Sequence, residues 1–208
     1  MRVARIAFFG DTVFALLLVL LILQVPLPDI PTTAGSLHDA LADRLPEMFG
    51  FFVSAGVVGG LWLDHHRRFD HVERRTDGLL RLNLAFLICV VFLWFPAGVL
   101  AQHIDAPLAA LFFAAWAAVS GLLGAVLTHY VPPEERRRLR RISLAMPVAF
   151  VLSAPVAFAV VDVGGTEVSL APILWVVALP AARRLLGRSG SVGSADTASN
   201  IDSRSPAS

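Results

Sequence analysis

The sequence has few charged residues, a single cysteine and no lysine. Only 16% of its 208 residues are charged, and the 17 basic residues, all arginine, nearly balance the 16 acidic ones. Net charge therefore gives no indication of a nucleic-acid partner, and none is expected. The lone Cys89 lies inside an apolar run, which excludes an intrachain disulfide and a cysteine-based metal site. We expect this cysteine to serve in packing.

Catalytic motifs are missing as well. The chain contains no glycine-rich phosphate loop, no catalytic serine elbow and no paired carboxylates at a useful spacing. His66 and Asp70 are four residues apart and would meet on a helix, but no second histidine cluster completes a set of metal ligands. The sequence thus predicts neither an enzyme nor a protein that holds a metal or another cofactor.

Hydrophobic residues, by contrast, make up 56% of the chain, and its mean hydropathy is +0.71. These values are typical of an integral membrane protein. Crossing a hydrocarbon core of about 30 Å takes about 20 helical residues. Apolar runs of that order occur at 7–27, 46–64, 78–100, 107–129, 142–161 and 168–186. We therefore predict an all-α domain of six transmembrane helices over residues 1–188, followed by a disordered cytoplasmic tail over residues 189–208.

The arginines predict the orientation of these spans. They gather before the first span, between the second and third, between the fourth and fifth, and after the sixth. Because short cytoplasmic loops retain arginine, both termini are expected in the cytoplasm. The alternative for the N-terminus is a cleaved signal peptide with Arg2 and Arg5 as its leader. The long apolar run, Asp11 within it and the prolines that follow disfavour that alternative.

The first span carries an acidic residue, Asp11, in its first turn. A carboxylate there is stabilised by the helix dipole, so Asp11 is either an interfacial cap or a polar anchor. As an anchor it would contact polar groups on neighbouring helices, with His65, His66 and Asn83 as candidates.

Further along the first span, one helix face is apolar. Thr12, Leu16, Val19 and Leu23 share this face, with Leu20 beside it. Such a stripe either faces lipid and neighbouring helices or, in a symmetric assembly, forms a hydrophobic constriction that gates ions by dewetting. Periodicity alone does not choose between these alternatives.

Two segments of the sequence resemble the prokaryotic members of the transmembrane protein 175 family of potassium channels. The first is RIAFFGDTVFALLLVLLILQV, which is similar to the family's R-x-x-x-F-S-D-G-V-F-A-I pattern. The matching residues there are Arg5, Phe9, Asp11, Val13, Phe14 and Ala15. The second runs from the end of the second span into the third, and its matching residues are Trp62, His65, His66, Arg67, Phe69, Asp77, Leu82, Asn83 and Leu84. The last three spans match only in hydropathy.

This resemblance implies a homotetramer of six-helix subunits whose first helices surround a central ion path without a TVGYG filter. Leu16 would lie at the main apolar constriction, with Leu20 and Leu23 in further layers toward the outside. An anchoring network around Asp11 would orient the pore helix and would include Arg5, Phe9, Trp62, His65, His66 and Asn83. The chain departs from the family pattern at Gly10, Thr12 and Gln24, and Val19 stands where the family has a threonine.

Three hypotheses remain. The first is a passive, potassium-preferring cation channel of a bacterial plasma membrane, with potassium and other monovalent cations and the lipid bilayer as its partners. The second is a non-conducting membrane scaffold or partner subunit of the same fold. Val19 supports it, because a ring of valines cannot replace the water around a cation as hydroxyls can. The third, a proton-coupled transporter or metal-dependent membrane enzyme, requires midplane titratable groups that the predicted midplane segments lack.

Overall fold

The computed structural model describes residues 3–27, 34–163, 166–176 and 181. Its long helices are α1 (Val3–Ile22), α3 (Leu45–Phe69), α4 (Asp77–Phe92), α6 (Pro107–Leu127) and α7 (Pro133–Ser153). Shorter elements are α2 (Ala34–Ala42), α5 (Trp94–Gln102), η1 (Thr128–Tyr130), η2 (Ala154–Phe158), β1 (Val160–Val163) and β2 (Thr166–Ser169). The predicted all-α membrane fold is confirmed.

Within the described residues, five helical segments are long and apolar enough to cross a membrane. They are Val3–Ile22, Leu37–Phe69, Asp77–Gln102, Pro107–Tyr130 and Pro133–Phe158. The third segment comprises α4 and α5, which meet at Leu93. Pro96 follows shortly after this junction and has no backbone N–H to donate. Most of the expected sixth span, from residue 177 onward, and the expected tail at 189–208 lie outside the described residues, apart from residue 181.

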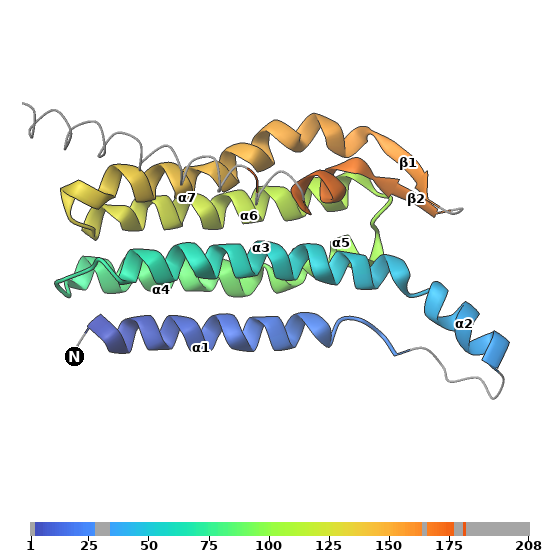
Figure 1. The fold of residues 1–208 in the computed structure, drawn as a ribbon, viewed down its shortest axis with the longest axis horizontal. Coiled ribbons are helices and arrows are strands. Elements are labelled where there is room, and N and C mark those ends of the chain that lie inside the picture. Colours follow the sequence, from blue (N-terminus) through green and yellow to red (C-terminus); the bar gives the residue numbers. More distant parts are fainter. Residues whose placement is uncertain (1–2, 28–33, 164–165, 177–180, 182–208) are drawn as a thin grey trace, which may run out of the picture.

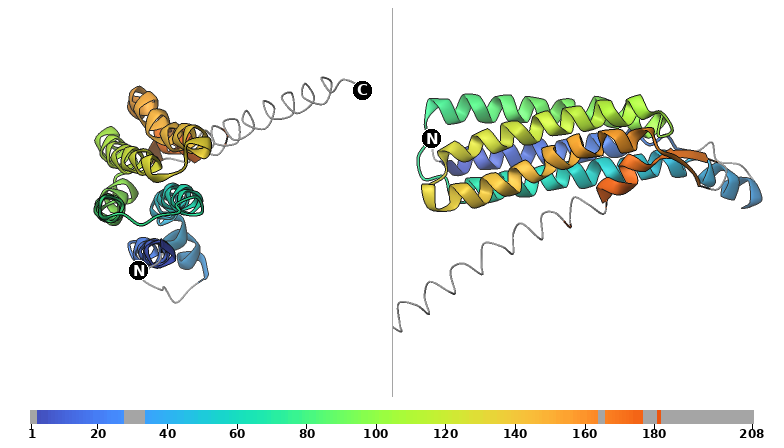
Figure 2. Two further views of the ribbon diagram at one scale, coloured as in Figure 1. Left: turned by 90° about the vertical axis from the view of Figure 1, so that its left-hand side faces the viewer. Right: turned by 90° about the horizontal axis from the view of Figure 1, so that it is seen from above.

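The helices form layers (Figures 1 and 2). Helix α1 lies along one edge of the bundle, α3 and α4 come next, and α6 and α7 lie on the side away from α1. Helix α1 contacts α3 and α4, while α6 packs most extensively against α7. The chain therefore places its N-terminal helix and its α6–α7 pair on opposite sides of the molecule.

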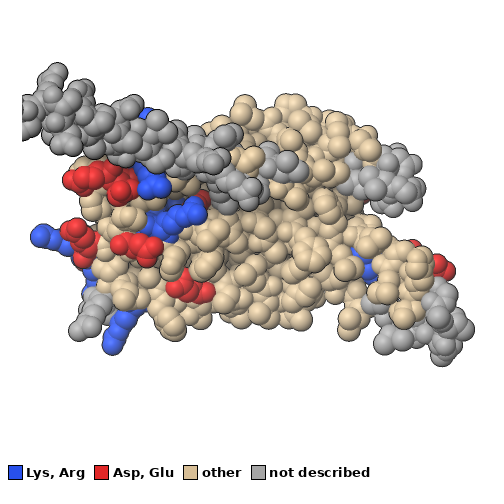
Figure 3. All heavy atoms as spheres, viewed as in Figure 1, with Lys and Arg blue, Asp and Glu red and all other residues tan. Residues whose placement is uncertain are grey.

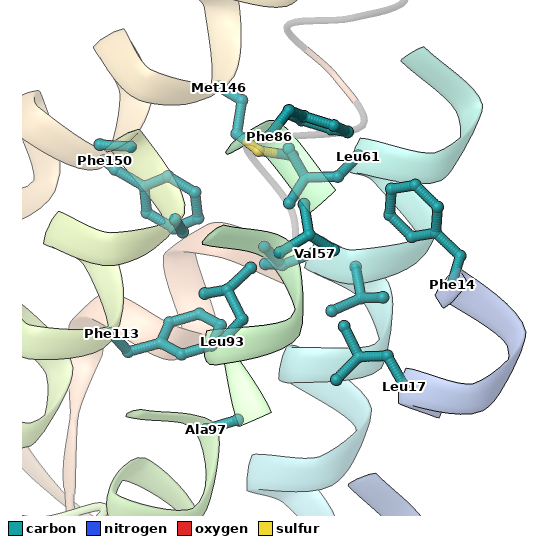
Figure 4. Packing of buried hydrophobic residues seen from close by; sticks show 14 of the residues in the cluster. Phe14, Leu17, Val57, Leu61, Phe86, Leu93, Ala97, Phe113, Met146 and Phe150 are labelled. Carbon is teal, nitrogen blue, oxygen red and sulfur yellow. The ribbon is translucent and has the colours of Figure 1, made fainter. Parts of the chain in front are cut away.

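The core runs through all of these layers (Figure 4). Phe14 and Leu17 of α1 point toward Val57 and Leu61 of α3, and Phe86 of α4 lies in the same cluster. All five side chains are buried, at 2% exposure or less. Because lipid is as apolar as these side chains, their close packing and not their hydrophobicity holds the helices together.

Small residues allow two close helix contacts. A Cβ at Gly121 of α6 would lie 2.9 Å from Pro147 Cδ of α7, and one at Gly50 of α3 would lie 2.6 Å from Ala101 Cα of α5. Pro147 lies inside α7, as membrane helices tolerate where neighbours pack against the break. These glycines thus permit the α6–α7 and α3–α5 interfaces.

The sequence did not indicate the hairpin at residues 160–169. Strands β1 and β2 pair antiparallel, with Val160 opposite Ser169. The Ser169 amide donates to the Ile104 carbonyl at 3.1 Å, which fastens the hairpin to the connection between α5 and α6. β-Branched residues such as Val160 and Val161 favour strands once such a docking edge is present.

Charged side chains gather at one end of the bundle in the view of Figure 3, and a broad uncharged band follows. That end carries the start of α1, the α3–α4 connection and the α6–α7 connection (Figure 1). This distribution matches a multi-pass membrane protein with its arginine-rich connections on one side.

Candidate functional site

Helix α1 has one packed face and one open face. Its buried residues are Ile6, Gly10, Phe14, Leu17 and Leu21. Leu16, Val19 and Leu23 are 59%, 55% and 73% exposed. At about 100° per residue these three lie roughly opposite the packed face. Leu20 is half-buried at the border between the two faces.

Asp11 contacts the neighbouring helix through a hydrogen bond. The indole Nε1 of Trp62, on α3, donates to Asp11 Oδ1 at 2.9 Å. The Trp62 ring also packs on His66, with their centroids 5.5 Å apart. A carboxylate acceptor makes this a charge-assisted bond, which is stronger than one between neutral groups. The interpretation of Asp11 as a polar anchor requires a contact of this kind between Asp11 and a neighbouring helix.

His65 and Asn83 form a second polar pair deeper in the bundle. The His65 Nε2 and Asn83 Oδ1 atoms lie 2.9 Å apart, and both side chains are buried. Because the amide oxygen accepts, His65 carries its proton on Nε2 in this pair. The imidazole is stacked on Phe86 at 5.5 Å with an interplanar angle of 5°. This pair joins α3 to α4 beneath the packed face of α1.

Gly10 provides the space for the His65 ring. A Cβ at Gly10 would lie 2.5 Å from His65 Cε1. Since both groups are buried, any larger residue must displace the ring or the helix. Gly10 therefore lets the α1 backbone lie close to the His65 ring.

Arg5 and Phe9 lie apart from these contacts. Both are exposed, and within the described residues Arg5 makes no hydrogen bond or ion pair. Arg5 lies eleven residues before Leu16, which places it on the same open face of α1. In the single subunit the structure thus brings together Asp11 with Trp62 and His65 with Asn83, but not Arg5 or Phe9 with them.

The other end of α1 is tied to the junction of α4 and α5. Gln24 Nε2 donates to the Trp94 carbonyl at 2.7 Å, and Trp94 Nε1 donates to the Leu20 carbonyl at 3.2 Å. Gly98 leaves room for the Gln24 amide, since a Cβ there would lie 2.9 Å from Gln24 Oε1. Trp94 was not among the site residues predicted from the sequence. The sequence feature that points to it is a tryptophan two residues before Pro96, at a helix break where backbone carbonyls become available as acceptors.

Arg68 is a second residue that the sequence analysis missed, because it took the whole arginine cluster as a cytoplasmic loop. Its side chain is 2% exposed, and its Nη1 donates to Ser143 Oγ of α7 at 2.8 Å. The guanidinium lies 5.5 Å from the centre of the Phe86 ring and against Gly124 of α6. Arg68 therefore links α3 to α4, α6 and α7. The adjacent Arg67 is half-exposed and pairs with Asp64 at 3.6 Å.

The described residues do not complete a set of metal ligands around His66 and Asp70. His66 and Asp70 line an open groove of about 470 Å³ beside α1, together with Asp11 and Phe69. Among the described residues, no group of three or more histidine, cysteine or acidic side chains could hold a metal ion.

Comparisons with known proteins show which family this chain resembles. Residues 5–93 match the model of the family described as endosomal/lysosomal potassium channel TMEM175. Two bacterial relatives are each named a potassium channel. The one from Streptomyces collinus is 35% identical to this chain over 100 residues, and the one from Chamaesiphon minutus is 33% identical over 105 residues. These alignments cover 48% and 50% of this chain and 48% and 51% of the relatives. The chain thus spans about half the length of the curated relatives that it matches.

A further relative, the endosomal/lysosomal proton channel TMEM175 of Bos taurus, is 38% identical over 93 residues, which cover 40% of this chain and 19% of that protein. Among solved structures, a TMEM175 homolog from Chamaesiphon minutus, titled a lysosomal potassium-selective channel homolog, matches with a TM-score of 0.67 at 22% identity. That match covers 88% of this chain and 95% of the other, and it shows a shared fold. The resemblance to the transmembrane protein 175 family is confirmed, and it is an ion-channel family and not a family of enzymes.

Proposed function

We propose that the protein is a passive, potassium-preferring cation channel in which four copies place α1 around a central path. The observation that carries this proposal is the open face of α1. Leu16, Val19 and Leu23 lie exposed on it, while the opposite face is packed against α3 and α4. The family described as endosomal/lysosomal potassium channel TMEM175 matches residues 5–93, which include most of α1.

The constriction would be formed by rings of leucine. A ring of Leu16 side chains narrows an aqueous path and disfavours water in it, which blocks ions until the path widens. Leu20 and Leu23 would add apolar layers toward the outside. The competing explanation is that this face simply contacts lipid, and mutation of the face distinguishes the two.

The contacts within the subunit would set the rotation of α1. The Asp11–Trp62 bond fixes it near the arginine-rich end, and the Gln24–Trp94 bond fixes it at the other end. His65 and Asn83 support the packed face from below. In this proposal these groups position the pore helix and do not bind ions. Arg5 and Phe9, exposed in one subunit, would complete the network across the assembly.

Assembly of the tetramer is supported by small residues that no described part of the same subunit covers. A Cβ at Gly56 or Gly59 of α3 would have no neighbour within 4 Å among the described residues. Such small surface residues let a helix of another subunit approach closely. The neighbouring Phe52 is also exposed and offers apolar contact area beside them.

The test is cation flux into liposomes reconstituted with purified protein, under potassium, sodium and caesium gradients. We expect potassium flux, and Leu16→Ala should raise it because the constriction widens. Leu18→Ala is the matched control, since Leu18 is also exposed but lies about 160° around the helix from Leu16. Equal flux in wild type and both variants, with intact oligomers, would show that Leu16 does not lie at the bottleneck.

A second candidate is a non-conducting scaffold or partner subunit, which Val19 favours because it stands in the place of the family's threonine. Valine offers no oxygen to a partly dehydrated cation. If the path is merely less conductive, Val19→Thr should raise potassium flux or change the preference among cations. If intact wild-type tetramers conduct nothing and Val19→Thr restores flux, the wild-type protein is the scaffold.

A further inference from the structure

A basic groove lies between α6 and α7. These two helices lie on the side of the bundle away from α1 (Figure 2). The groove is open to the outside and has a volume of about 380 Å³. Its lining residues are Leu122, Ala125, Val126, Thr128, His129, Arg136, Arg140 and Leu144. None of them is acidic, so the lining carries the positive charge of two arginines.

The groove has a charged end and an apolar end. On α7, Arg136, Arg140 and Leu144 follow one another at intervals of four residues and share one face. On the facing side Leu122 and Val126 of α6 are four residues apart, and His129 of η1 follows three residues later. Because the two helices are antiparallel, the cationic residues meet His129 at the arginine-rich end. The leucines meet about 12 Å deeper in the uncharged band.

The arginines are available to an anion. Arg136 donates from Nε and Nη2 to the Val131 carbonyl at 3.1 and 3.0 Å, which holds its guanidinium in place. Its Nη1 has no partner among the described residues. Arg140 is exposed and forms no ion pair within the described chain. The nearby Glu135 pairs instead with Arg138, at 3.8 Å and outside the groove.

We propose that this groove binds one anionic phospholipid per subunit. Its phosphate would lie between Arg136 and Arg140, and an acyl chain would lie along Val126, Leu122 and Leu144. Basic pockets between transmembrane helices hold such headgroups. The exposed Leu122 and Val126 give the chain an apolar surface at membrane depth. The proposal does not depend on ion conduction, because the groove is formed by α6 and α7 and not by α1.

The test counts lipids that stay bound. Purified protein is equilibrated with vesicles of phosphatidylcholine and phosphatidylglycerol, extracted, and examined by native mass spectrometry. We expect one retained phosphatidylglycerol per subunit, and Arg140→Gln should lower its retention about fivefold, the contribution of one arginine near a membrane surface. Arg138→Gln is the matched control. It removes the same charge from the same helix, but from outside the groove.

Equal losses in Arg140→Gln and Arg138→Gln would show a general charge effect and overturn the proposal, as would unchanged retention in both. A second variant, Val126→Trp, fills the apolar part of the groove and leaves both arginines in place. It should expel the lipid. If Val126→Trp leaves lipid retention unchanged, or if inorganic phosphate alone displaces the lipid fully, the groove recognises only an anion. Either result would overturn the proposal of a phospholipid site. Thermal melting of each variant confirms that the helix bundle has folded.

Discussion

The hydrogen bond between Asp11 and Trp62 offers the sharpest test of how α1 is held. Trp62→Phe removes the indole donor but keeps an aromatic ring against His66. Asp11→Ala removes the acceptor. Asp11→Asn keeps an acceptor oxygen and removes only the charge. The double variant Asp11→Ala/Trp62→Phe closes a thermodynamic cycle that isolates the energy of this one contact.

The expected coupling follows from the geometry. A hydrogen bond to a charged group contributes about 1.5–3 kcal/mol when it is buried. Both side chains here are only partly buried, so solvent screening lowers the expected coupling to about 1–2 kcal/mol. Asp11→Asn should lose less than Asp11→Ala. Unfolding in mixed micelles of mild and denaturing detergent measures these differences, and size-exclusion chromatography follows the assembly.

Two results would refute the reasoning. Additive losses in the two single variants, with no coupling within about 0.3 kcal/mol, would show that the contact does not hold α1. Stable Asp11→Ala tetramers with altered preference among potassium, sodium and caesium would make Asp11 an ion ligand and not an anchor. Trp62→Phe breaks the same bond but keeps the carboxylate, so a changed preference in Asp11→Ala alone indicates an ion ligand, and a changed preference in both variants indicates a displaced α1.

Three further variants test other contacts. Gly10→Ala should lower the melting temperature and disturb the His65 imidazole signals in NMR spectra, because the new Cβ meets that ring; unchanged signals would contradict this steric account. Arg68→Met should cost about 1–3 kcal/mol in the same micelle titration, since Ser143 loses its partner, and a neutral result would show that the buried guanidinium only fills space. Gly56→Ile should abolish tetramers in size-exclusion chromatography while helix content by circular dichroism stays intact, and persistent tetramers would exclude this face from the interface.

The membrane fold could be predicted from the sequence for physical reasons, whereas the residue that contacts Asp11 could not. Apolar runs longer than a bilayer is thick have few other interpretations. A charge in such a run needs a partner, and the few polar residues in the neighbouring spans limit the choice. His65 and Asn83 were named on that basis, and they pair with each other, while Trp62, which came from the family resemblance, contacts Asp11.

The remaining features depend on tertiary contacts that leave no local pattern. Arg67 and Arg68 are adjacent and chemically identical, yet only Arg68 is buried, because the gap beside Gly124 lies on its side of α3. The hairpin at 160–169 lies between the predicted fifth and sixth spans, and hydropathy assigned its first and last residues to those helices. Its docking on the Ile104 carbonyl decides its conformation, and that contact comes from a segment more than fifty residues earlier.

The two faces of α1 also separate two kinds of effect. Gly10 and Phe14 lie on the packed face, so changes there act on the stability and rotation of the helix in every state of the protein. Leu16 and Val19 are exposed and lie outside the core cluster of the described residues, so changes there should leave the folding of the subunit nearly unaltered. A variant of the open face that changes flux without changing subunit stability therefore acts at the path itself. A variant of the packed face that changes flux must first be shown to keep α1 in place.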